Sequence, residues 1–374
     1  MRRIGIEVQR LFRKKKHGIE IVALELIKEL QQSDTRNEYV LFVKEDVDDT
    51  CVSETSNWKI KKLKGKTYFD WEQFSLPAAV KKEKIDFLHS TCNTSAIRNT
   101  VPLLLTLHDI YYLEHFNFKG TAYQNFGNLY RRIIVPKVVK RSKFIITVSE
   151  YEKEVISDFL HLPKEKIKVV YNAVNSRFNT SYSVSDVENV RKKYQLPESY
   201  ILHLGNTAPQ KNTRNAIIAY TQYCRSTGNP VPIVILDYAK ALVLTQLKET
   251  KNDDLAKPFY FPGFITSNEM PLVYNAATLF LYPSLRESFG LPILEAMGCG
   301  TPVITSSAAA MLEVAGNAAL LVNPHDTDSL AEKIEELLGD TSLQSELTQK
   351  GIQRAAQFTW KKSASDLLEI YKAM

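Results

Sequence analysis

Short apolar runs alternate with longer amphipathic stretches along the whole chain. In the first half, residues 19–30 carry apolar side chains at helical spacing, and the short runs around them have the length of buried strands. The strands predicted in this half are 4–8, 39–43, 87–88, 103–107, 144–148 and 167–170. Strands that alternate with helices in this way indicate a parallel sheet with helices on both of its faces.

An Asn- and Ser-rich stretch at 175–189 interrupts this alternation and is interpreted as a linker. The alternation then starts again, with strands predicted at 200–204, 233–236, 259–261, 279–281, 303–304 and 319–322 and helices at 328–338, 343–356 and 361–372. The chain is therefore predicted to be an α/β protein with two Rossmann-like, doubly wound parallel-sheet domains, over 1–180 and 181–357, followed by a C-terminal helix over 358–374. Because such sheets bind ligands at the carboxyl ends of their strands, the cleft between the domains is the expected site.

Composition favours a cytoplasmic protein. The four cysteines, Cys51, Cys92, Cys224 and Cys299, lack the spacing of zinc ligands, and scattered thiols are typical of a reducing compartment. The first residues show no signal-peptide pattern. No run reaches the roughly 18–20 apolar residues that span a bilayer. We expect a cytoplasmic chain.

Basic residues are concentrated in the first half of the chain. Residues 1–180 carry 31 Lys and Arg against 22 Asp and Glu, although the net charge of the whole chain is only +6. Lysines and arginines on solvent-exposed faces of the protein would account for this excess. The alternative is that the basic region makes peripheral contact with the anionic inner face of a membrane. The predicted helix at 123–139 is a candidate docking face, or else an amphipathic helix that faces the core. No nucleic-acid-binding module is present, so no nucleic-acid partner is expected.

The segment 283–302, PSLRESFGLPILEAMGCGTP, carries the strongest candidate for a binding site. It follows a predicted strand, and Pro292 suits the first turn of a helix, where its missing N–H costs nothing. The amides before this helix start would stabilise an anion such as phosphate, and Gly290 would let the backbone approach a ligand. Glu287 and Glu295 flank the helix start and can accept hydrogen bonds from hydroxyl groups. This combination indicates a site for a sugar nucleotide.

The segment resembles the paired-glutamate motif of the retaining glycosyltransferases of family 4, the group 1 glycosyltransferases, which have the GT-B fold. Further segments resemble the same family: 106–109, 147–150, 171–174, 200–211, 262–265, 296–306 and 313–324. The resemblance covers nearly the whole chain and is closest to the mannosyltransferase-B-like branch, which builds surface polysaccharides such as lipopolysaccharide. In this family the final helix often packs back on the first domain.

The resemblance also implies roles for particular residues. His108, Glu287 and Lys211 would form the catalytic group, with His108 facing the transferred sugar and Lys211 neutralising the diphosphate. Asp109 would be an orienting or capping residue rather than a general base. The loop at His17 and Gly18 would approach the phosphates or the acceptor. The family often has two glycines where this chain has His17 and Gly18. The donor-binding residues would be Gly205, Asn206, Lys211, Gly263, Phe264, Ile265, Glu287, Ser288, Phe289, Gly290, Leu291 and Glu295.

We expect no cofactor and no metal, because the chain has no Asp-X-Asp motif and Lys211 with the helix amides can meet the charge of a diphosphate. The predicted reaction is the retaining transfer of a hexose, mannose being favoured, from a nucleotide-diphosphate sugar to a glycan or lipid-linked oligosaccharide. A sugar-nucleotide epimerase, a phosphorylase and a non-catalytic nucleotide-sugar-binding protein remain alternatives. A nicotinamide dehydrogenase is excluded, because no glycine-rich fingerprint follows the first strand.

Overall fold

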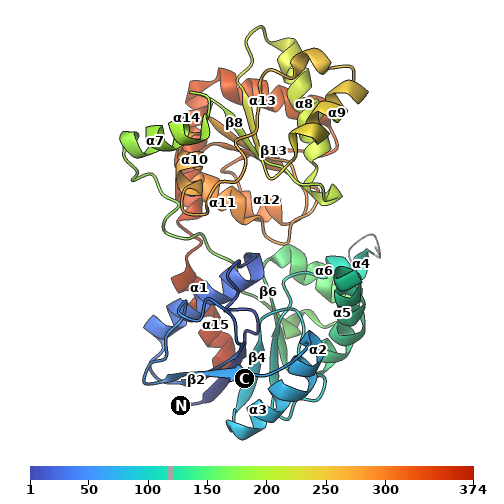
Figure 1. The fold of residues 1–374 in the computed structure, drawn as a ribbon, viewed down its shortest axis with the longest axis vertical. Helices are drawn as coiled ribbons and strands as arrows, with labels where there is room; N and C mark the ends of the chain where they lie inside the picture. Colours follow the sequence, from blue (N-terminus) through green and yellow to red (C-terminus); the bar gives the residue numbers. More distant parts are fainter. Residues whose placement is uncertain (116–121) are drawn as a thin grey trace. The chain divides into compact units, whose positions relative to one another are not determined.

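The computed structural model describes residues 1–115 and 122–374. For residues 122–124 it describes the backbone but not the side chains. Contacts within the chain group the residues into two compact units (Figure 1). The first unit contains residues 1–172 and 360–374, and the second contains residues 173–359. The sequence placed these transitions near residues 180 and 357.

The first unit is built on a parallel sheet of seven strands in the order β3-β2-β1-β4-β5-β6-β7. Its strands are β1 (Arg3–Glu7), β2 (Glu38–Lys44), β3 (Trp58–Leu63), β4 (Phe87–Ser90), β5 (Leu103–Thr106), β6 (Phe144–Thr147) and β7 (Ile167–Val169). Its helical segments are α1 (Gly18–Ser33), α2 (Tyr68–Asp70), η1 (Trp71–Ser75), α3 (Leu76–Lys82), α4 (Tyr111–Glu114), α5 (Ala122–Arg141), α6 (Glu150–Leu160), η2 (Lys164–Lys166) and α15 (Trp360–Ala373).

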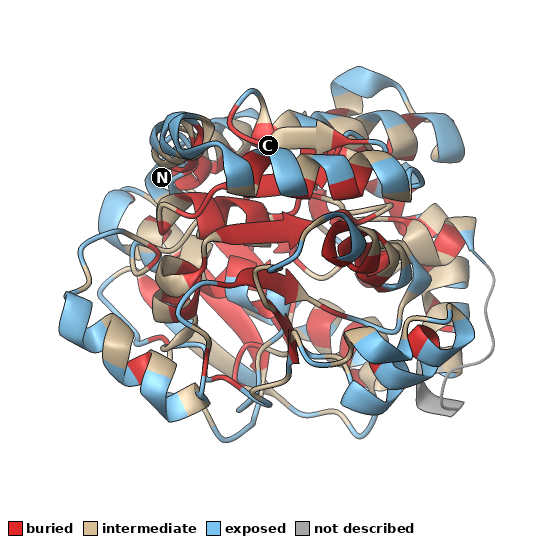
Figure 2. Ribbon diagram, turned by 90° about the horizontal axis from the view of Figure 1, so that it is seen from above, coloured by how far each residue is buried: buried red, intermediate tan, exposed pale blue. Residues whose placement is uncertain are grey.

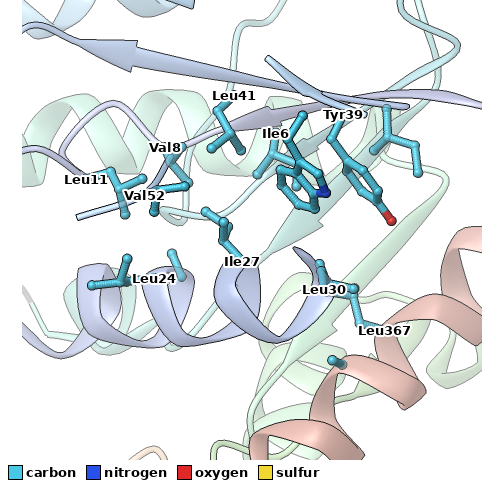
Figure 3. Packing of buried hydrophobic residues seen from close by; sticks show 14 of the residues in the cluster. Ile6, Val8, Leu11, Leu24, Ile27, Leu30, Tyr39, Leu41, Val52 and Leu367 are labelled. Carbon is cyan, nitrogen blue, oxygen red and sulfur yellow. The ribbon is translucent and has the colours of Figure 1, made fainter. Parts of the chain in front are cut away.

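The C-terminal helix α15 packs beside α1 on one face of the first sheet (Figure 1). Leu367 of α15 belongs to the same buried cluster as Leu30 of α1 and Ile6 of β1 (Figure 3). Tyr371 of α15 is also a member of this cluster. The Tyr371 hydroxyl also hydrogen-bonds Nδ1 of His89 at 2.7 Å. Burial of these side chains holds the last residues of the chain against the first strand.

The second unit contains a parallel sheet of six strands in the order β10-β9-β8-β11-β12-β13. Its strands are β8 (Ile201–Leu204), β9 (Ile233–Leu236), β10 (Phe259–Tyr260), β11 (Leu279–Tyr282), β12 (Val303–Ser306) and β13 (Leu320–Val322). Its helical segments are α7 (Val184–Tyr194), η3 (Pro209–Lys211), α8 (Thr213–Ser226), α9 (Lys240–Glu249), η4 (Asp253–Leu255), α10 (Met270–Ala276), α11 (Leu291–Gly298), α12 (Ala310–Ala315), α13 (Thr327–Gly339) and α14 (Thr341–Ala355). In both units the buried strands lie beneath helices whose outer faces are exposed (Figure 2).

Two elements differ from the sequence prediction. The linker predicted at 175–189 is wrong over its second part, because α7 begins at Val184, and the side chain of Ser183 caps this helix by accepting a hydrogen bond from Asp186 N. The strand β3 was not predicted, because its sequence is rich in lysine. It lies at the edge of the first sheet, where lysine is tolerated, and its Trp58 ring stacks on Tyr39 at 3.9 Å.

The order of strands marks where each sheet can hold a ligand. In both sheets the chain reverses its direction of winding between two central strands, β1 and β4 in the first unit and β8 and β11 in the second. Loops that leave such a pair at their carboxyl ends diverge to opposite faces of the sheet and leave a crevice. The loops after β8 and β11 contain the glycines and charged residues that the sequence singled out.

Candidate functional site

Two loops of the second unit are joined at its switch point. The loop after β8 runs from Gly205 to Asn212, and the loop after β11 runs from Pro283 to Gly290. Leu285 N donates to the carbonyl of Gln210 at 2.8 Å, and Asn212 Nδ2 donates to the carbonyl of Pro283 at 2.9 Å. These bonds hold the loop that contains Lys211 and the loop that contains Glu287 together as one structure.

Gly205 is required where β8 turns into its loop. A Cβ atom at this position would lie 2.5 Å from Cβ of Tyr238, so that a larger residue would push the loop after β9 away. The next residue, Asn206, shapes the loop: its amide N donates to Oγ1 of Thr213 at 2.9 Å, and its Oδ1 accepts from Ala208 N at 2.8 Å. Both residues therefore build the loop that carries Lys211.

Lys211 and Glu287 form an ion pair at the centre of this site. The ammonium of Lys211 lies 2.7 Å from Oε1 and 3.0 Å from Oε2 of Glu287. The hydroxyl of Tyr282 donates to Oε1 of the same carboxylate at 2.8 Å. The Lys211 side chain is 28% exposed and the Glu287 side chain 14%, so the ammonium remains open to a ligand. Residues 76 positions apart thus meet in one charged group.

The helix α11 begins directly after this pair. Its N-cap is Gly290, whose φ of 95° is strained for any residue with a Cβ atom. The amide of Ile293 is already bonded to the carbonyl of Gly290, and Pro292 has no N–H, so the helix start offers a ligand chiefly the amides of Gly290 and Leu291. Phe289 is buried, with its ring 5.7 Å from that of Phe358, and this packing holds the turn. The neighbouring Ser288 is half-buried.

Glu295, the second glutamate of the motif, is the fifth residue of α11. Burial raises its pKa to about 7, while a hydrogen bond from the Tyr274 hydroxyl at 3.2 Å and the charge of Arg177 act in the opposite direction. This carboxyl can accept hydrogen bonds from ligand hydroxyls, and it does so best when ionised.

The third segment that the sequence predicts to bind the donor lies towards the edge of the second sheet. Gly263, Phe264 and Ile265 follow β10, which is two strands away from β8. Ile265 is buried, whereas the Phe264 side chain is 74% exposed, and Gly263 has a φ of 80°. An exposed aromatic ring on such a loop is available for stacking on a flat ligand group.

The first unit contains a separate cavity of about 930 Å³ at the switch point of its own sheet. Three residues predicted for the acceptor and phosphate loop, His17, Gly18 and Asp109, line this cavity. His17 is the N-cap of α1, and its amide donates to Oε2 of Glu20 at 3.0 Å. Asp109 Oδ1 accepts from Tyr111 N at 3.1 Å, which is a capping contact.

His108 is more deeply buried than its neighbour Asp109. Its Nε2 lies 3.0 Å from the carbonyl of Thr91, so this nitrogen carries the proton, and its backbone amide donates to Oδ1 of Asn93 at 2.7 Å. Burial lowers the pKa of the imidazole. The ring is thus a neutral imidazole of fixed orientation, and its contact with the transferred sugar stays a prediction.

Sequence reasoning missed a buried acidic group behind the cavity. Glu72 accepts hydrogen bonds from the hydroxyls of Tyr68 at 2.9 Å, Tyr130 at 2.6 Å and Thr94 at 2.5 Å, and both tyrosines line the cavity. Glu7, at the end of β1, is also buried, and its Oε2 has no hydrogen-bond partner among the described residues. The sequence signal for this buried acidic group was the carboxylate of Glu7 inside the apolar run 4–8.

Glu7 is expected to make stability depend on pH. Burial and the nearby Glu72 raise its pKa from 4.5 to about 8, against opposing contributions from the Gln9 amide and Arg10. Between these two values the unfolded chain loses the proton and the folded chain keeps it, so the folded state is progressively disfavoured as pH rises. Each unit of pKa corresponds to about 1.4 kcal/mol.

The stability of Glu7→Gln relative to the native chain should therefore rise by more than about 1 kcal/mol from pH 5 to pH 8. Urea unfolding at several pH values measures this difference. Glu45→Gln, at an exposed position, is the control. A difference that stays constant with pH would show that Glu7 is ionised in the folded chain.

Two kinds of feature are absent from the part of the chain that the structure describes. Within residues 1–115 and 122–374, no three His, Cys, Asp or Glu side chains gather in a way that could hold a metal ion. No helix in these same ranges has both the length and the apolar character needed to cross a membrane.

The two doubly wound sheets, each with a switch-point site, define the architecture of the GT-B glycosyltransferases. HepE of Anabaena, solved in complex with UDP, superposes with a TM-score of 0.75 at 19% identity over 100% of both chains. Residues 186–373 match the family of glycosyl transferases group 1, and residues 16–178 match glycosyltransferase family 4. The chain belongs to the group 1 glycosyltransferases, which confirms the resemblance noted in its sequence.

Two of the curated relatives are O-antigen chain mannosyltransferases. The O-antigen chain mannosyltransferase B of Escherichia coli is 33% identical over 236 residues, which are 62% of this chain and 61% of that protein. The O-antigen chain mannosyltransferase RfbU of Salmonella typhimurium is 32% identical over 246 residues, 64% of this chain and 63% of that protein. The matched regions thus span about three fifths of these two relatives.

Proposed function

We propose that this chain transfers a hexose, mannose being favoured, from a nucleotide-diphosphate sugar to a glycan or lipid-linked oligosaccharide in surface polysaccharide synthesis. The reaction proceeds with retention at the anomeric carbon and needs no metal ion or cofactor. The observation that carries the proposal is the joining of the Lys211–Glu287 ion pair to the start of α11 at the switch point of the second sheet. The two mannosyltransferase relatives support mannose as the sugar.

The donor is bound by both loops of the second unit. Lys211 and the amides before α11 bind the diphosphate, because an ammonium and helix-start amides both favour a cluster of anionic oxygens. Glu295 accepts hydrogen bonds from the ribose hydroxyls, and Glu287 accepts them from the hydroxyls of the sugar. The segment 263–265 lies beside the nucleobase, where the exposed Phe264 ring can stack. HepE, solved with UDP and with UDP-glucose, supports a nucleotide-sugar donor.

The chemical step separates charge at the diphosphate. The bond from the anomeric carbon to the diphosphate oxygen breaks, a bond to the acceptor oxygen forms, and the acceptor proton passes to the leaving phosphate. The negative charge that develops is stabilised by Lys211 and by the amides near Gly290, which are held in place before the reaction by the bonds between the two loops. His108 faces the transferred sugar as a neutral imidazole of fixed orientation, with Asp109 beside it; its Nδ1 is a hydrogen-bond acceptor, because Nε2–H is bonded to the Thr91 carbonyl.

The proposed function is tested with the purified chain, nucleotide-diphosphate mannose and a membrane extract that supplies acceptors. We expect transfer of labelled mannose with release of the nucleoside diphosphate, and we expect the rate to be unchanged in excess EDTA. Loss of transfer in EDTA with recovery on adding magnesium would end the metal-free proposal. Conversion of the sugar without acceptor, or a requirement for free phosphate, would instead identify an epimerase or a phosphorylase.

We also propose that the chain works at the inner face of the membrane. The basic excess of its first half supports contact with an anionic surface.

A further inference from the structure

Each of the two motif glutamates in the second unit accepts a hydrogen bond from a buried tyrosine hydroxyl. The Tyr282 hydroxyl, at the end of β11, donates to Oε1 of Glu287 at 2.8 Å. The Tyr274 hydroxyl, in α10, donates to Oε2 of Glu295 at 3.2 Å. Sequence reasoning assigned neither tyrosine to the site. The candidate donor site thus contains two tyrosine–glutamate pairs.

Both tyrosine rings pack against the same residue, Phe280 of β11. The Phe280 ring centroid lies 5.3 Å from that of Tyr274 in an edge-on arrangement and 5.4 Å from that of Tyr282 in a stacked one. Tyr274 and Tyr282 are themselves only 0% and 4% exposed. Because close-packed aromatic rings do not turn freely, each hydroxyl is directed at its own carboxylate.

The backbone of each tyrosine is held as well. Thr301 Oγ1 donates to the carbonyl of Tyr274 at 2.6 Å, and Thr305 Oγ1 donates to the carbonyl of Tyr282 at 2.8 Å. Both threonines are buried. Side chains that are locked by packing and by such secondary hydrogen bonds can hold a binding group in one geometry. The two hydroxyls are therefore placed before any ligand binds.

Both hydroxyls keep the proton that they donate. Burial, together with the charge of the adjacent glutamate, raises the pKa of Tyr274 and of Tyr282 well above the ordinary range of a phenol. A protonated phenol has one hydrogen to donate, and a carboxylate can only accept it. Hydrogen bonds to ionised acceptors are also stronger than those between neutral groups.

The tyrosines leave one oxygen of each carboxylate for a ligand. Within the part of the chain that the structure describes, Oε1 of Glu295 has no hydrogen-bond partner. In the same part of the chain, Oε2 of Glu287 is bonded only to the Lys211 ammonium, at 3.0 Å. Since each tyrosine occupies the opposite oxygen, it decides which oxygen faces the donor.

We propose that Tyr274 and Tyr282 are positioning residues with separate tasks at the donor site. Tyr274 orients Glu295 for the ribose hydroxyls and thereby sets the affinity for the nucleotide. Tyr282 orients Glu287 for the hydroxyls of the transferred sugar and thereby sets the rate of transfer, because the rate depends on how the reacting sugar is aligned. This inference rests on the proposed function, since it assigns the tyrosines to the same donor site.

Phenylalanine variants test this division of tasks, because they remove one hydroxyl and keep the ring. Y274F should weaken binding of the preferred nucleoside diphosphate, GDP or UDP, at least about fivefold, since the lost hydrogen bond is made to a charged group. Y282F should bind the same nucleotide with native affinity, because a nucleoside diphosphate lacks the sugar. Its kcat should fall at least about tenfold at saturating donor. Calorimetry and the mannose-transfer assay measure the two quantities.

Y220F is the matched control. Tyr220 is equally buried, and its hydroxyl donates to the carbonyl of Val231 at 3.0 Å and contacts neither glutamate. This variant should keep the native nucleotide affinity and the native kcat. The inference is overturned if Y274F binds the nucleotide normally, if Y282F keeps the native kcat, or if Y220F is impaired to the same extent as these two variants.

Double variants separate positioning from a general structural role. A residue that acts through its glutamate has no further effect once that glutamate is removed. Y274F should therefore not weaken nucleotide binding further in the Glu295→Ala chain, and Y282F should not lower kcat further in the Glu287→Ala chain. Additive losses would show that the tyrosines support the fold rather than the glutamates, and they would refute the inference.

The proposed function and this inference fail in different ways. If the native chain transfers mannose while Y274F and Y282F behave like Y220F, the function stands and the positioning role is refuted. If the native chain binds no nucleoside diphosphate, the proposed function fails, and the positioning role fails with it.

Discussion

Replacing Lys211 with alanine is expected to lower kcat by at least about 100-fold. The ammonium of Lys211 lies 2.7 Å from Glu287 where the loops after β8 and β11 meet, and the proposed reaction leaves a full negative charge on the diphosphate. Removing one preorganised donor of this kind costs roughly 2.7–4 kcal/mol in the transition state. The measurement is turnover at saturating donor, so that any weakening of donor binding does not enter the result.

The matched control is Arg214→Ala. Arg214 lies three residues further along, but its side chain is 62% exposed and pairs with Glu249 at 3.1 Å. The Arg214→Ala variant should keep the native rate, because an exposed ion pair contributes little to stability. Lys211→Arg should recover part of the rate lost in the alanine variant, because the charge returns in a larger and differently shaped group. A Lys211→Ala enzyme with a near-native rate would remove Lys211 from the proposed mechanism.

Replacing Glu295 with alanine is expected to weaken nucleoside diphosphate binding by about 10- to 100-fold. Hydrogen bonds to a charged group contribute about 1.5–3 kcal/mol, and about 1.4 kcal/mol is a tenfold change in affinity. Glu295 is half-buried beside Tyr274 rather than fully exposed, so water replaces the lost contacts poorly. Calorimetric titration with UDP and GDP measures the effect and shows which base is preferred.

The same glutamate should make nucleotide binding depend on pH. Because burial raises its pKa to about 7, part of the free protein carries a protonated Glu295 at neutral pH. Hydroxyl donors favour the ionised form, so binding releases a proton, and affinity rises as pH increases through about 7. Glu295→Gln does not titrate and should show a flatter profile. An affinity for the native chain that is constant from pH 6 to pH 8 would contradict the proposed contact with ribose.

Much of the fold could be predicted from the sequence because each signal is local. The apolar runs of three to five residues that became β1, β2, β5, β6, β8, β9 and β11 are nearly continuous, as expected for parallel strands buried on both faces. The start of α11 was visible because Gly290 and Pro292 mark a helix N-terminus in any context. Strand β3 was not predicted, because four of its six residues are Lys or Trp and it lacks a continuous apolar run. An edge strand tolerates such a sequence, since only one of its faces has to be buried.

The candidate site depended in part on contacts that no local pattern reveals. The resemblance to family 4 assigned Lys211 and Glu287 to one catalytic group, but their ion pair is visible only once β8 and β11 are known to be neighbours in the sheet. Glu72 lies in a short π-helix with no motif, and its function in holding Tyr68 and Tyr130 is visible only when α5 packs over it. The cavity lined by Arg10 and Lys66 likewise draws on residues from separate loops.

The sequence by itself determined the two α/β halves, the family and the residues around the start of α11, because secondary structure and short motifs depend on neighbours along the chain. Only the tertiary structure decided which charges meet, which acids are buried and which side of α5 remains exposed. The pKa of Glu7 and the pairing of Lys211 depend on desolvation and on distances across the sheet, and both are set by packing between segments far apart in the chain.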